Sequence, residues 1–147
     1  MTWKCFDPTT PLLIQGMTGK EGQRLTRWLL QSQMHVVGGV TPGKGGQTVE
    51  ACPIFDTVAE LRTRLPEAQT SCITAPGPRV LEAVREAIEA GVTAIHILAE
   101  QVPIHDVIAI RTLAEGKVSI LGPSSIGYLQ FPAFRLGFLG GENPFPL

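Results

Sequence analysis

The stretch Leu12-Leu13-Ile14-Gln15-Gly16-Met17-Thr18-Gly19-Lys20-Glu21-Gly22 decides the fold. In it an apolar run precedes three regularly spaced glycines, and a helical pattern begins near Glu21. This order predicts a strand, a tight turn and a helix. In such a setting glycines let backbone N–H groups close on a phosphate at the helix N-terminus. The alternative interpretation is that the three glycines serve only to pack the helix tightly against the strand.

A second glycine-rich stretch, Gly38-Gly39-Val40-Thr41-Pro42-Gly43-Lys44-Gly45-Gly46, follows the next apolar run. Its glycines favour a loop that can wrap an anion, and Lys44 adds a cation to that loop. Together the two stretches indicate a site for a phosphate-rich, nucleotide-like ligand. The alternative interpretation is that Lys44 is an ordinary solvated surface lysine without a role in binding.

Outward from these stretches, apolar strands alternate with amphipathic helices, which predicts a parallel sheet covered on both faces. The expected strands cover residues 12–15, 35–40, 53–55, 71–75, 93–98 and 118–121, with one more over 134–138. The expected helices cover residues 21–33, 58–65, 79–90 and 103–115. We therefore expect an α/β fold: a single domain with a Rossmann-like, doubly wound, mostly parallel sheet. Its five main strands should have the order 3-2-1-4-5, with room for extension at an edge. A ligand should lie where the first and fourth strands diverge, outside their carboxyl ends.

The composition narrows the class of protein. A chain of 147 residues suits one domain, and 44% hydrophobic with 17% charged residues is typical of a globular protein with a buried sheet. A formal net charge of −1 gives no field that would attract nucleic acid or an anionic membrane.

Cys5, Cys52 and Cys72 lack metal-ligand spacing, so we expect no metal site, reduced thiols and a cytoplasmic location. Residues 1–10 lack the apolar core of a signal peptide and no apolar run approaches membrane-spanning length, so we expect neither a signal peptide nor a membrane span.

Several motifs together resemble one known family. The two glycine stretches are followed by Pro53-Ile54-Phe55-Asp56-Thr57-Val58, by the helical segment 82–91, and by Gly122-Pro123-Ser124-Ser125-Ile126-Gly127. In this order the motifs are similar to the amino-terminal CoA-binding domain of the succinyl-CoA synthetase alpha subunit. The resemblance runs over residues 12–140, and ATP-citrate lyase carries a related domain.

The resemblance implies coenzyme A or an acyl-CoA as the ligand. It implies that the first glycine turn holds the nucleotide end of CoA and that Lys44 is the charged partner of CoA. It also implies that Leu98-Ala99-Glu100, which matches the family's Ile-Thr-Glu, lines the CoA path. The implied cofactor-binding residues are Gly16, Thr18, Gly19, Lys20, Glu21, Gly22, Lys44, Ala75, Pro76, Leu98, Ala99 and Glu100. The chain has Lys20-Glu21 where the family usually has Ser-Gln, which puts a negative charge close to the expected phosphate.

The resemblance also bears on catalysis. Family members continue into a second domain that carries a phosphohistidine, whereas this sequence ends at Leu147. His35, His96 and His105 lack the glycine-flanked setting of that histidine, and His96 is expected to be packed and hydrogen-bonded within a strand. We expect residues 1–147 to be a CoA-binding domain without the phosphohistidine ligase domain, with no catalytic residue and no ligase activity alone. A ligase beta-type subunit or a second copy of the chain is the expected partner, met through the apolar tail 134–147.

Two other functions stay open on the sequence. The fold would suit an NAD(P)-binding redox module, but the first turn reads Gly-x-x-Gly-x-x-Gly rather than Gly-x-Gly-x-x-Gly. In addition, Gly38-Gly39-Val40 stands where an acidic residue would hold an adenosine ribose. The chain could also be a non-catalytic subunit-interaction protein whose glycine loops are empty. The acyl substrate, the ATP or GTP preference of a partner and the oligomeric state are left open.

Overall fold

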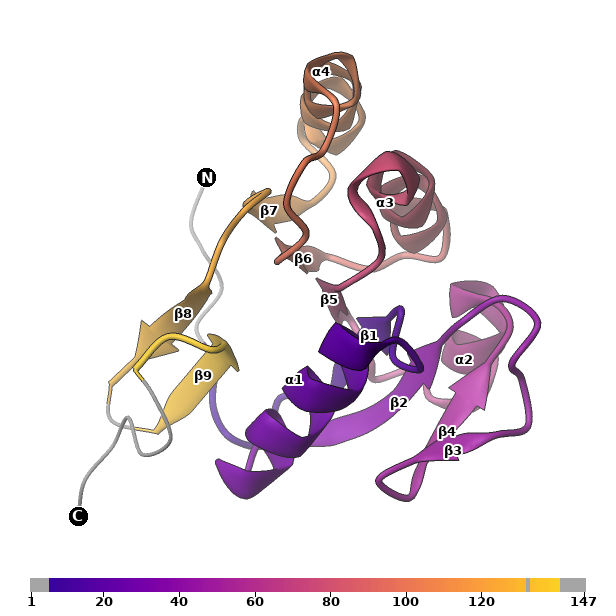
Figure 1. Ribbon diagram of the computed structural model, residues 1–147, viewed down its shortest axis with the longest axis vertical. Helices are drawn as coiled ribbons and strands as arrows, with labels where there is room; N and C mark the ends of the chain where they lie inside the picture. Colours follow the sequence, from indigo (N-terminus) through magenta and orange to yellow (C-terminus); the bar gives the residue numbers. More distant parts are fainter. Residues whose placement is uncertain (1–5, 132, 141–147) are drawn as a thin grey trace.

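The computed structural model describes residues 6–131 and 133–140, and its strands alternate with helices (Figure 1). The strands are β1 (Leu12–Gln15), β2 (Val36–Val40), β3 (Thr48–Val49), β4 (Cys52–Phe55), β5 (Thr70–Ile73), β6 (Ala94–Ile97), β7 (Ser119–Leu121), β8 (Gly127–Gln130) and β9 (Phe134–Gly137). The helices are α1 (Lys20–Gln31), α2 (Val58–Arg64), α3 (Val80–Glu89) and α4 (Ile104–Ala114), with a short 3-10 helix, η1 (Gly77–Arg79), before α3.

Seven strands form one sheet in the order β3-β4-β2-β1-β5-β6-β7. Neighbouring strands from β4 to β7 are parallel, and β3 is antiparallel to β4. The expected order 3-2-1-4-5 is confirmed by β4-β2-β1-β5-β6, and β7 extends the sheet at one edge. The sequence analysis missed β3, because its two residues directly follow a glycine-rich loop and pair only with the neighbouring β4.

Alternating side chains along the strands produce the doubly wound arrangement. Leu13 packs in the core cluster formed with α2, α3 and α4, whereas Leu12 and Ile14 pack in the cluster formed with α1. All three side chains are fully buried, and burying such a side chain stabilises the fold by about 1.5–3 kcal/mol. Figure 1 shows α2, α3 and α4 on one face of the sheet and α1 with β8 and β9 on the other. Because both faces are covered, the strands read as nearly continuous apolar runs.

The strands β8 and β9 form a separate antiparallel hairpin on the α1 side of the molecule. Arg135 of β9 is fully buried, and its guanidinium lies 5.2 Å from the ring of Trp28 in α1. It donates hydrogen bonds to Ser32 Oγ at 3.1 Å and to the carbonyl oxygen of Leu139 at 2.8 Å. This arginine therefore fastens the hairpin to the C-terminal half of α1. The sequence predicted β9 but missed β8, which is short and starts with glycine.

Element boundaries differ from the prediction where local backbone geometry ends a helix. α1 ends at Gln31 instead of residue 33 because Gln33 adopts a left-handed φ of 61°. The expected helix 79–90 is divided, since its first residue belongs to η1 and α3 begins at Val80. α2 begins after Thr57, whose side-chain oxygen accepts the N–H of Glu60 at 3.0 Å as an N-cap.

The thiols of Cys52 and Cys72 are free and buried. Burial raises the pKa of Cys72 to about 12, so its thiol stays protonated at neutral pH. Cys5 and the tail 141–147, which belongs to the expected interface, lie outside the described residues. Within the part of the chain that the structure describes, no helix combines the length and the apolar character needed to span a bilayer.

Candidate functional site

The turn after β1 requires glycine at two of its three glycine positions. Gly16 has a φ of 86°, which L side chains rarely adopt. A Cβ at Gly22 would overlap the carbonyl oxygen of Gly16 and the backbone of Met17. Gly19 differs, because its φ is −69° and a Cβ there would meet the Gly16 oxygen at an ordinary 3.4 Å. Backbone conformation therefore accounts for Gly16 and packing for Gly22, whereas the protein itself would tolerate a Cβ at Gly19.

The first turn of α1 presents backbone donors that have no partner in the part of the chain that the structure describes. The N–H groups of Thr18 and Gly19 are hydrogen-bonded within the turn region, to Thr41 Oγ1 at 3.3 Å and to the Gly16 oxygen at 3.1 Å. None of the hydrogen bonds recorded among the described residues uses the N–H groups of residues 20–22. Together with the positive end of the helix dipole, these donors form an environment that favours an anion.

The loop that carries Lys44 is held beside this turn. The N–H of Gly45 donates to Asp56 Oδ1 at 2.9 Å, which fastens the loop to the segment before α2. The bond from Thr18 to Thr41 links the same loop to the turn after β1. The Lys44 side chain is exposed and forms no ion pair among the described residues, so it is available to pair with an anion.

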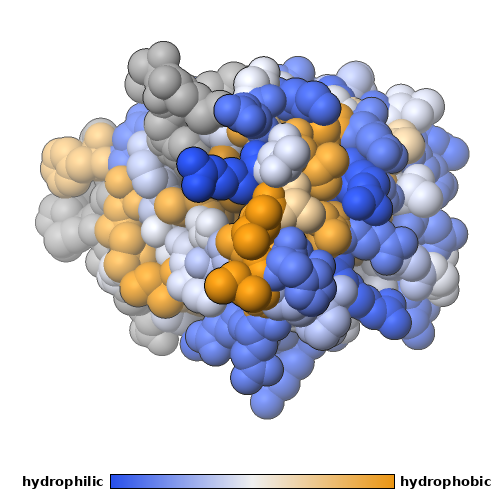
Figure 2. All heavy atoms as spheres, turned by 90° about the horizontal axis from the view of Figure 1, so that it is seen from above, coloured by the Kyte–Doolittle hydropathy of each residue, from blue (hydrophilic) through white to orange (hydrophobic). Residues whose placement is uncertain are grey.

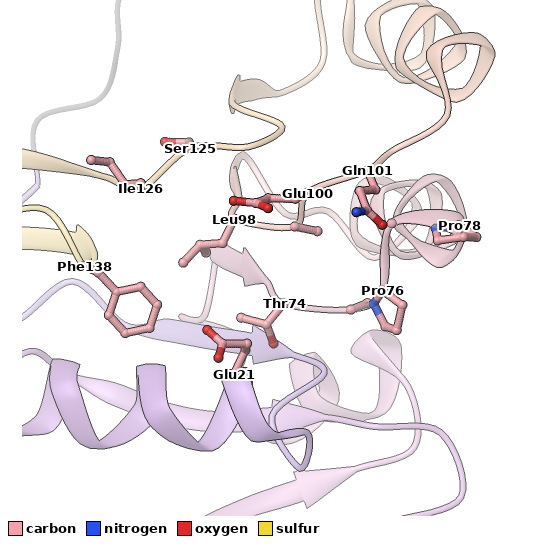
Figure 3. A pocket seen from close by; sticks show the side chains of 13 residues that line it. Glu21, Thr74, Pro76, Pro78, Leu98, Glu100, Gln101, Ser125, Ile126 and Phe138 are labelled. Atoms are coloured by element: carbon pink, nitrogen blue, oxygen red, sulfur yellow. The ribbon is translucent and has the colours of Figure 1, made fainter.

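A cavity of about 610 Å³ lies beyond the carboxyl ends of β5 and β6, beside the first turn of α1 (Figure 3). The chain leaves β1 towards one face of the sheet and β5 towards the other, so this is the switch point of the doubly wound fold. The described lining comes from α1, from the loops after β5 and β6, and from the residues flanking the hairpin: Glu21, Thr74, Ala75, Pro76, Gly77, Pro78, Leu98, Ala99, Glu100, Gln101, Ser125, Ile126 and Phe138.

Half of the residues expected to bind the cofactor line this cavity, namely Glu21, Ala75, Pro76, Leu98, Ala99 and Glu100. The other half, Gly16, Thr18, Gly19, Lys20, Gly22 and Lys44, belong to the glycine turn and the lysine loop and lie outside the lining. The structure thus gathers the strand-end residues around one cavity, with the glycine turn beside it and the lysine loop linked to that turn through Thr41.

The sequence analysis missed the contribution of the hairpin to the cavity wall. Ile126 precedes β8 and Phe138 follows β9, and the pairing of Gly127 with Gly137 brings the two residues together. The N–H of Phe138 donates to the Ile126 oxygen at 2.7 Å. The sequence analysis found no signal for this pairing. Thr74, by contrast, directly follows β5 and could have been found from the strand-end rule alone.

Two carboxylates provide the charges of the described lining, those of Glu21 and Glu100 (Figure 3). Glu21 Oε2 lies 3.6 Å from Arg24 Nη1, and both side chains are about half exposed. The Arg24 guanidinium lies 4.6 Å from the centre of the Phe138 ring, which forms part of the cavity wall. A cation is therefore held at the rim of the cavity by a carboxylate and an aromatic face.

His96 lies in β6 and is fully buried. Burial lowers the pKa of its imidazole to about 4, and the backbone of Ser125 opposes this shift only in part. The histidine is packed as expected, and the backbone of Ser125 is the polar group that approaches its ring, although neither ring nitrogen forms a hydrogen bond of ordinary geometry among the described residues. A neutral, enclosed imidazole of this kind is not part of the cavity lining.

The family described as "CoA binding domain" matches residues 7–101 of the chain. The alpha subunit of the ADP-forming succinate–CoA ligase of Staphylococcus aureus is 32% identical over 137 residues, which are 92% of this chain and 45% of that protein. The chain thus spans about half the length of the curated relatives it matches.

Among solved structures, ATP citrate lyase from Methanothrix soehngenii, in complex with citrate and coenzyme A, is similar with a TM-score of 0.77 and 20% identity. That similarity covers 92% of this chain and 24% of the lyase chain. The repressor RSP in complex with NADH is similar with a TM-score of 0.56 and 18% identity, over 76% of this chain and 52% of the repressor. At these sequence identities, the two similarities show a shared fold and nothing more.

Proposed function

The chain belongs to the family of CoA binding domains, and we propose that it binds coenzyme A across its two glycine loops and the adjoining cavity. The observation that carries this proposal is the position of the cavity. Leu98, Ala99 and Glu100 line it at the carboxyl edge of the sheet, and the unused N–H groups of residues 20–22 lie beside it. A ligand with an anionic end and a long neutral arm fits such a combination.

In this proposal the phosphates of CoA contact the start of α1 and Lys44. The backbone donors of residues 20–22 receive a phosphate, the missing side chain of Gly19 lets it approach the backbone, and Lys44 adds a point charge. The arm then passes Ala75 and Pro76 towards Leu98, Ala99 and Glu100. Gly16 and Gly22 contribute by allowing the turn to form.

The alternative function is NAD(P) binding, which the same fold would also allow. β2 ends in Val40 and is followed by Thr41, so no carboxylate stands at the end of this strand to hold an adenosine ribose. The likeness to an NADH complex concerns the fold alone, so it gives this alternative no support from particular residues. We therefore favour CoA over a dinucleotide.

We further propose that these 147 residues bind CoA without transferring a phosphoryl group. His96 is buried, and His35 and His105 lie outside the described cavity lining, so no histidine is placed there to accept phosphate. The phosphoryl chemistry of the ligases would then come from another polypeptide, such as a beta-type subunit, or from a second domain. Free, protonated thiols in the core support a cytoplasmic location.

Isothermal titration of the purified chain with CoA and with NAD⁺ tests the proposal. We expect saturable binding of CoA and binding of NAD⁺ at least about tenfold weaker, because only CoA offers a group for each part of the site. Equal or tighter binding of NAD⁺ would favour the redox alternative, and no binding of either would favour empty glycine loops.

A further inference from the structure

Arg24 is an exposed charged residue of α1 that its two neighbours set apart. Hydrophilic side chains cover much of the face of the molecule seen in Figure 2, so charge and exposure alone do not distinguish Arg24. Its guanidinium, however, lies against two groups of the cavity lining, the carboxylate of Glu21 at 3.6 Å and the ring of Phe138 at 4.6 Å. Arg24 thus lies at the cavity although it is not part of the described lining.

The place of Arg24 on α1 brings its side chain to the first turn of the helix. Side chains of an α-helix lean towards the helix N-terminus, and residues three positions apart lie on the same face. Arg24 accordingly extends to Glu21, in the turn where the N–H groups of residues 20–22 have no partner among the described residues. The guanidinium and these backbone donors therefore lie at the same end of α1.

Glu21 puts a negative charge at the place where the proposed site receives phosphate. It belongs to the first turn of α1, and its carboxylate repels any phosphate that approaches the backbone donors there. Arg24 offsets this charge, since its Nη1 lies 3.6 Å from Oε2 of Glu21. Because a guanidinium carries several N–H donors, Arg24 can pair with Glu21 and still donate to a second anion.

Phe138 holds the guanidinium from the other side. Its ring lies within the range of a cation–π contact with Arg24. The ring is itself held in place, because the N–H of Phe138 donates to the Ile126 oxygen at 2.7 Å and its ring centre lies 5.8 Å from that of Trp28. An arginine that a carboxylate and a ring already restrict loses less rotamer entropy when it binds an anion. Arg24 is therefore preorganised for a ligand at the start of α1.

We propose that Arg24 binds the diphosphate of CoA and, by offsetting Glu21, allows the site to accept this anion beside a carboxylate. The inference rests on the proposed function, because it assigns a contact to a CoA that must first bind. A diphosphate at the start of α1 receives the backbone donors of residues 20–22 together with the guanidinium. Lys44, which belongs to the other loop, is then left for the 3′-phosphate. Arg24 and Lys44 thereby have different partners, which a ligand without the 3′-phosphate distinguishes.

Calorimetric titration of the purified chain with CoA and with dephospho-CoA tests this assignment. We expect Arg24→Gln to weaken both ligands about tenfold, because both carry the diphosphate. Arg24→Lys should recover part of the loss, since it keeps the positive charge. Arg27→Gln is the matched control, because Arg27 also lies on α1 and pairs with Glu50 at the same 3.6 Å, whereas neither residue lines the cavity. This control should change both affinities by less than about twofold.

A second set of variants tests whether Arg24 acts by offsetting Glu21 or only by supporting Phe138. Glu21→Gln should bind CoA about threefold more tightly than the unaltered chain, because it removes a charge of the same sign as the phosphates. With Glu21→Gln already present, Arg24→Gln should weaken CoA only about threefold, because no carboxylate then needs to be offset. A role confined to the support of Phe138 would instead give the same tenfold loss with and without Glu21→Gln.

The outcomes separate this inference from the proposed function. Absence of CoA binding by the unaltered chain would overturn the proposed function and this inference with it. Normal CoA binding by both the unaltered chain and Arg24→Gln would overturn the inference alone. Equal losses with and without Glu21→Gln would also overturn it, as would a loss for CoA that dephospho-CoA does not share, since the diphosphate would then not be the partner of Arg24.

Discussion

At the scale of single residues, the three glycines of the first turn have different functions. A Cβ at Gly22 would overlap backbone atoms, so packing requires glycine there. Gly19 has ordinary backbone angles and a Cβ there would overlap no atom, so in the proposed site its missing side chain serves the approach of a phosphate. The even spacing of the glycines in the sequence conceals this difference, because only the structure shows which Cβ positions are free.

Substitution by alanine distinguishes these functions. Gly22→Ala should lower the free energy of unfolding by about 2 kcal/mol or more, because the backbone of the turn must move. Gly19→Ala should change the unfolding free energy by less than about 1 kcal/mol and weaken CoA binding several-fold. Urea unfolding and calorimetric titration of both variants measure these effects. A Gly19→Ala variant that binds CoA normally would show that the ligand does not approach the backbone at Gly19.

Lys44 is the clearest candidate for a charge contact with phosphate. It is exposed and free of ion pairs among the described residues, and its loop is fixed through Gly45 and Thr41. Lys44→Ala should weaken CoA about tenfold and dephospho-CoA less, if the 3′-phosphate is its partner. The matched control is Lys117→Ala, at an exposed position that does not line the cavity. Equal losses in the two variants would point to a general charge effect instead of a contact.

At the scale of elements, β6 contains a titratable group whose burial has consequences for stability. Burial lowers the pKa of His96 to about 4, below the ordinary imidazole value of 6.5. The unfolded chain therefore binds a proton at higher pH than the folded chain does, and stability falls as the pH decreases from about 6.5 to 4. The loss contributed by this one residue is roughly 3 kcal/mol.

His96→Leu should remove that part of the pH dependence. Thermal unfolding between pH 7 and pH 4 should show a smaller decrease in melting temperature for His96→Leu than for the unaltered chain. His105→Asn, which changes a side chain that is 80% exposed, should retain the full decrease. Parallel curves for all three proteins would mean that groups other than His96 cause the acid sensitivity.

The hairpin of β8 and β9 completes the cavity only because it is docked on α1. Arg135 lies against Trp28 and donates to Ser32, and Trp28 also meets Phe138 with the ring centres 5.8 Å apart. Arg135→Ala should lower the free energy of unfolding by about 2–4 kcal/mol, because it removes hydrogen bonds and leaves a void. It should also accelerate hydrogen exchange at the Phe138 amide and weaken CoA binding. Arg64→Ala, at an exposed position of α2, is the control, and similar exchange rates in both variants would contradict this role.

At the scale of the whole molecule, the strand order was predictable because it follows from local signals. Apolar runs such as Leu12 to Ile14 mark the strands, and the glycine turn marks the first crossover. Phe138 was not predictable as a cavity residue, since its place depends on the pairing of residues 127–130 with residues 134–137 and on a buried arginine. The sequence also could not predict that the ring nitrogens of His96 lack hydrogen bonds of ordinary geometry, because these depend on the groups that surround β6 in three dimensions.

The central claim is that CoA occupies the cavity and the adjoining glycine turn. Backbone amide shifts of ¹⁵N-labelled protein during a CoA titration test it most directly. The largest changes should fall on residues 18–22, 74–77 and 98–101, which form the turn and the cavity wall. Shifts confined to the separate groove lined by residues such as Ile110, Ile120 and Pro123, or no shifts at millimolar CoA, would contradict the account.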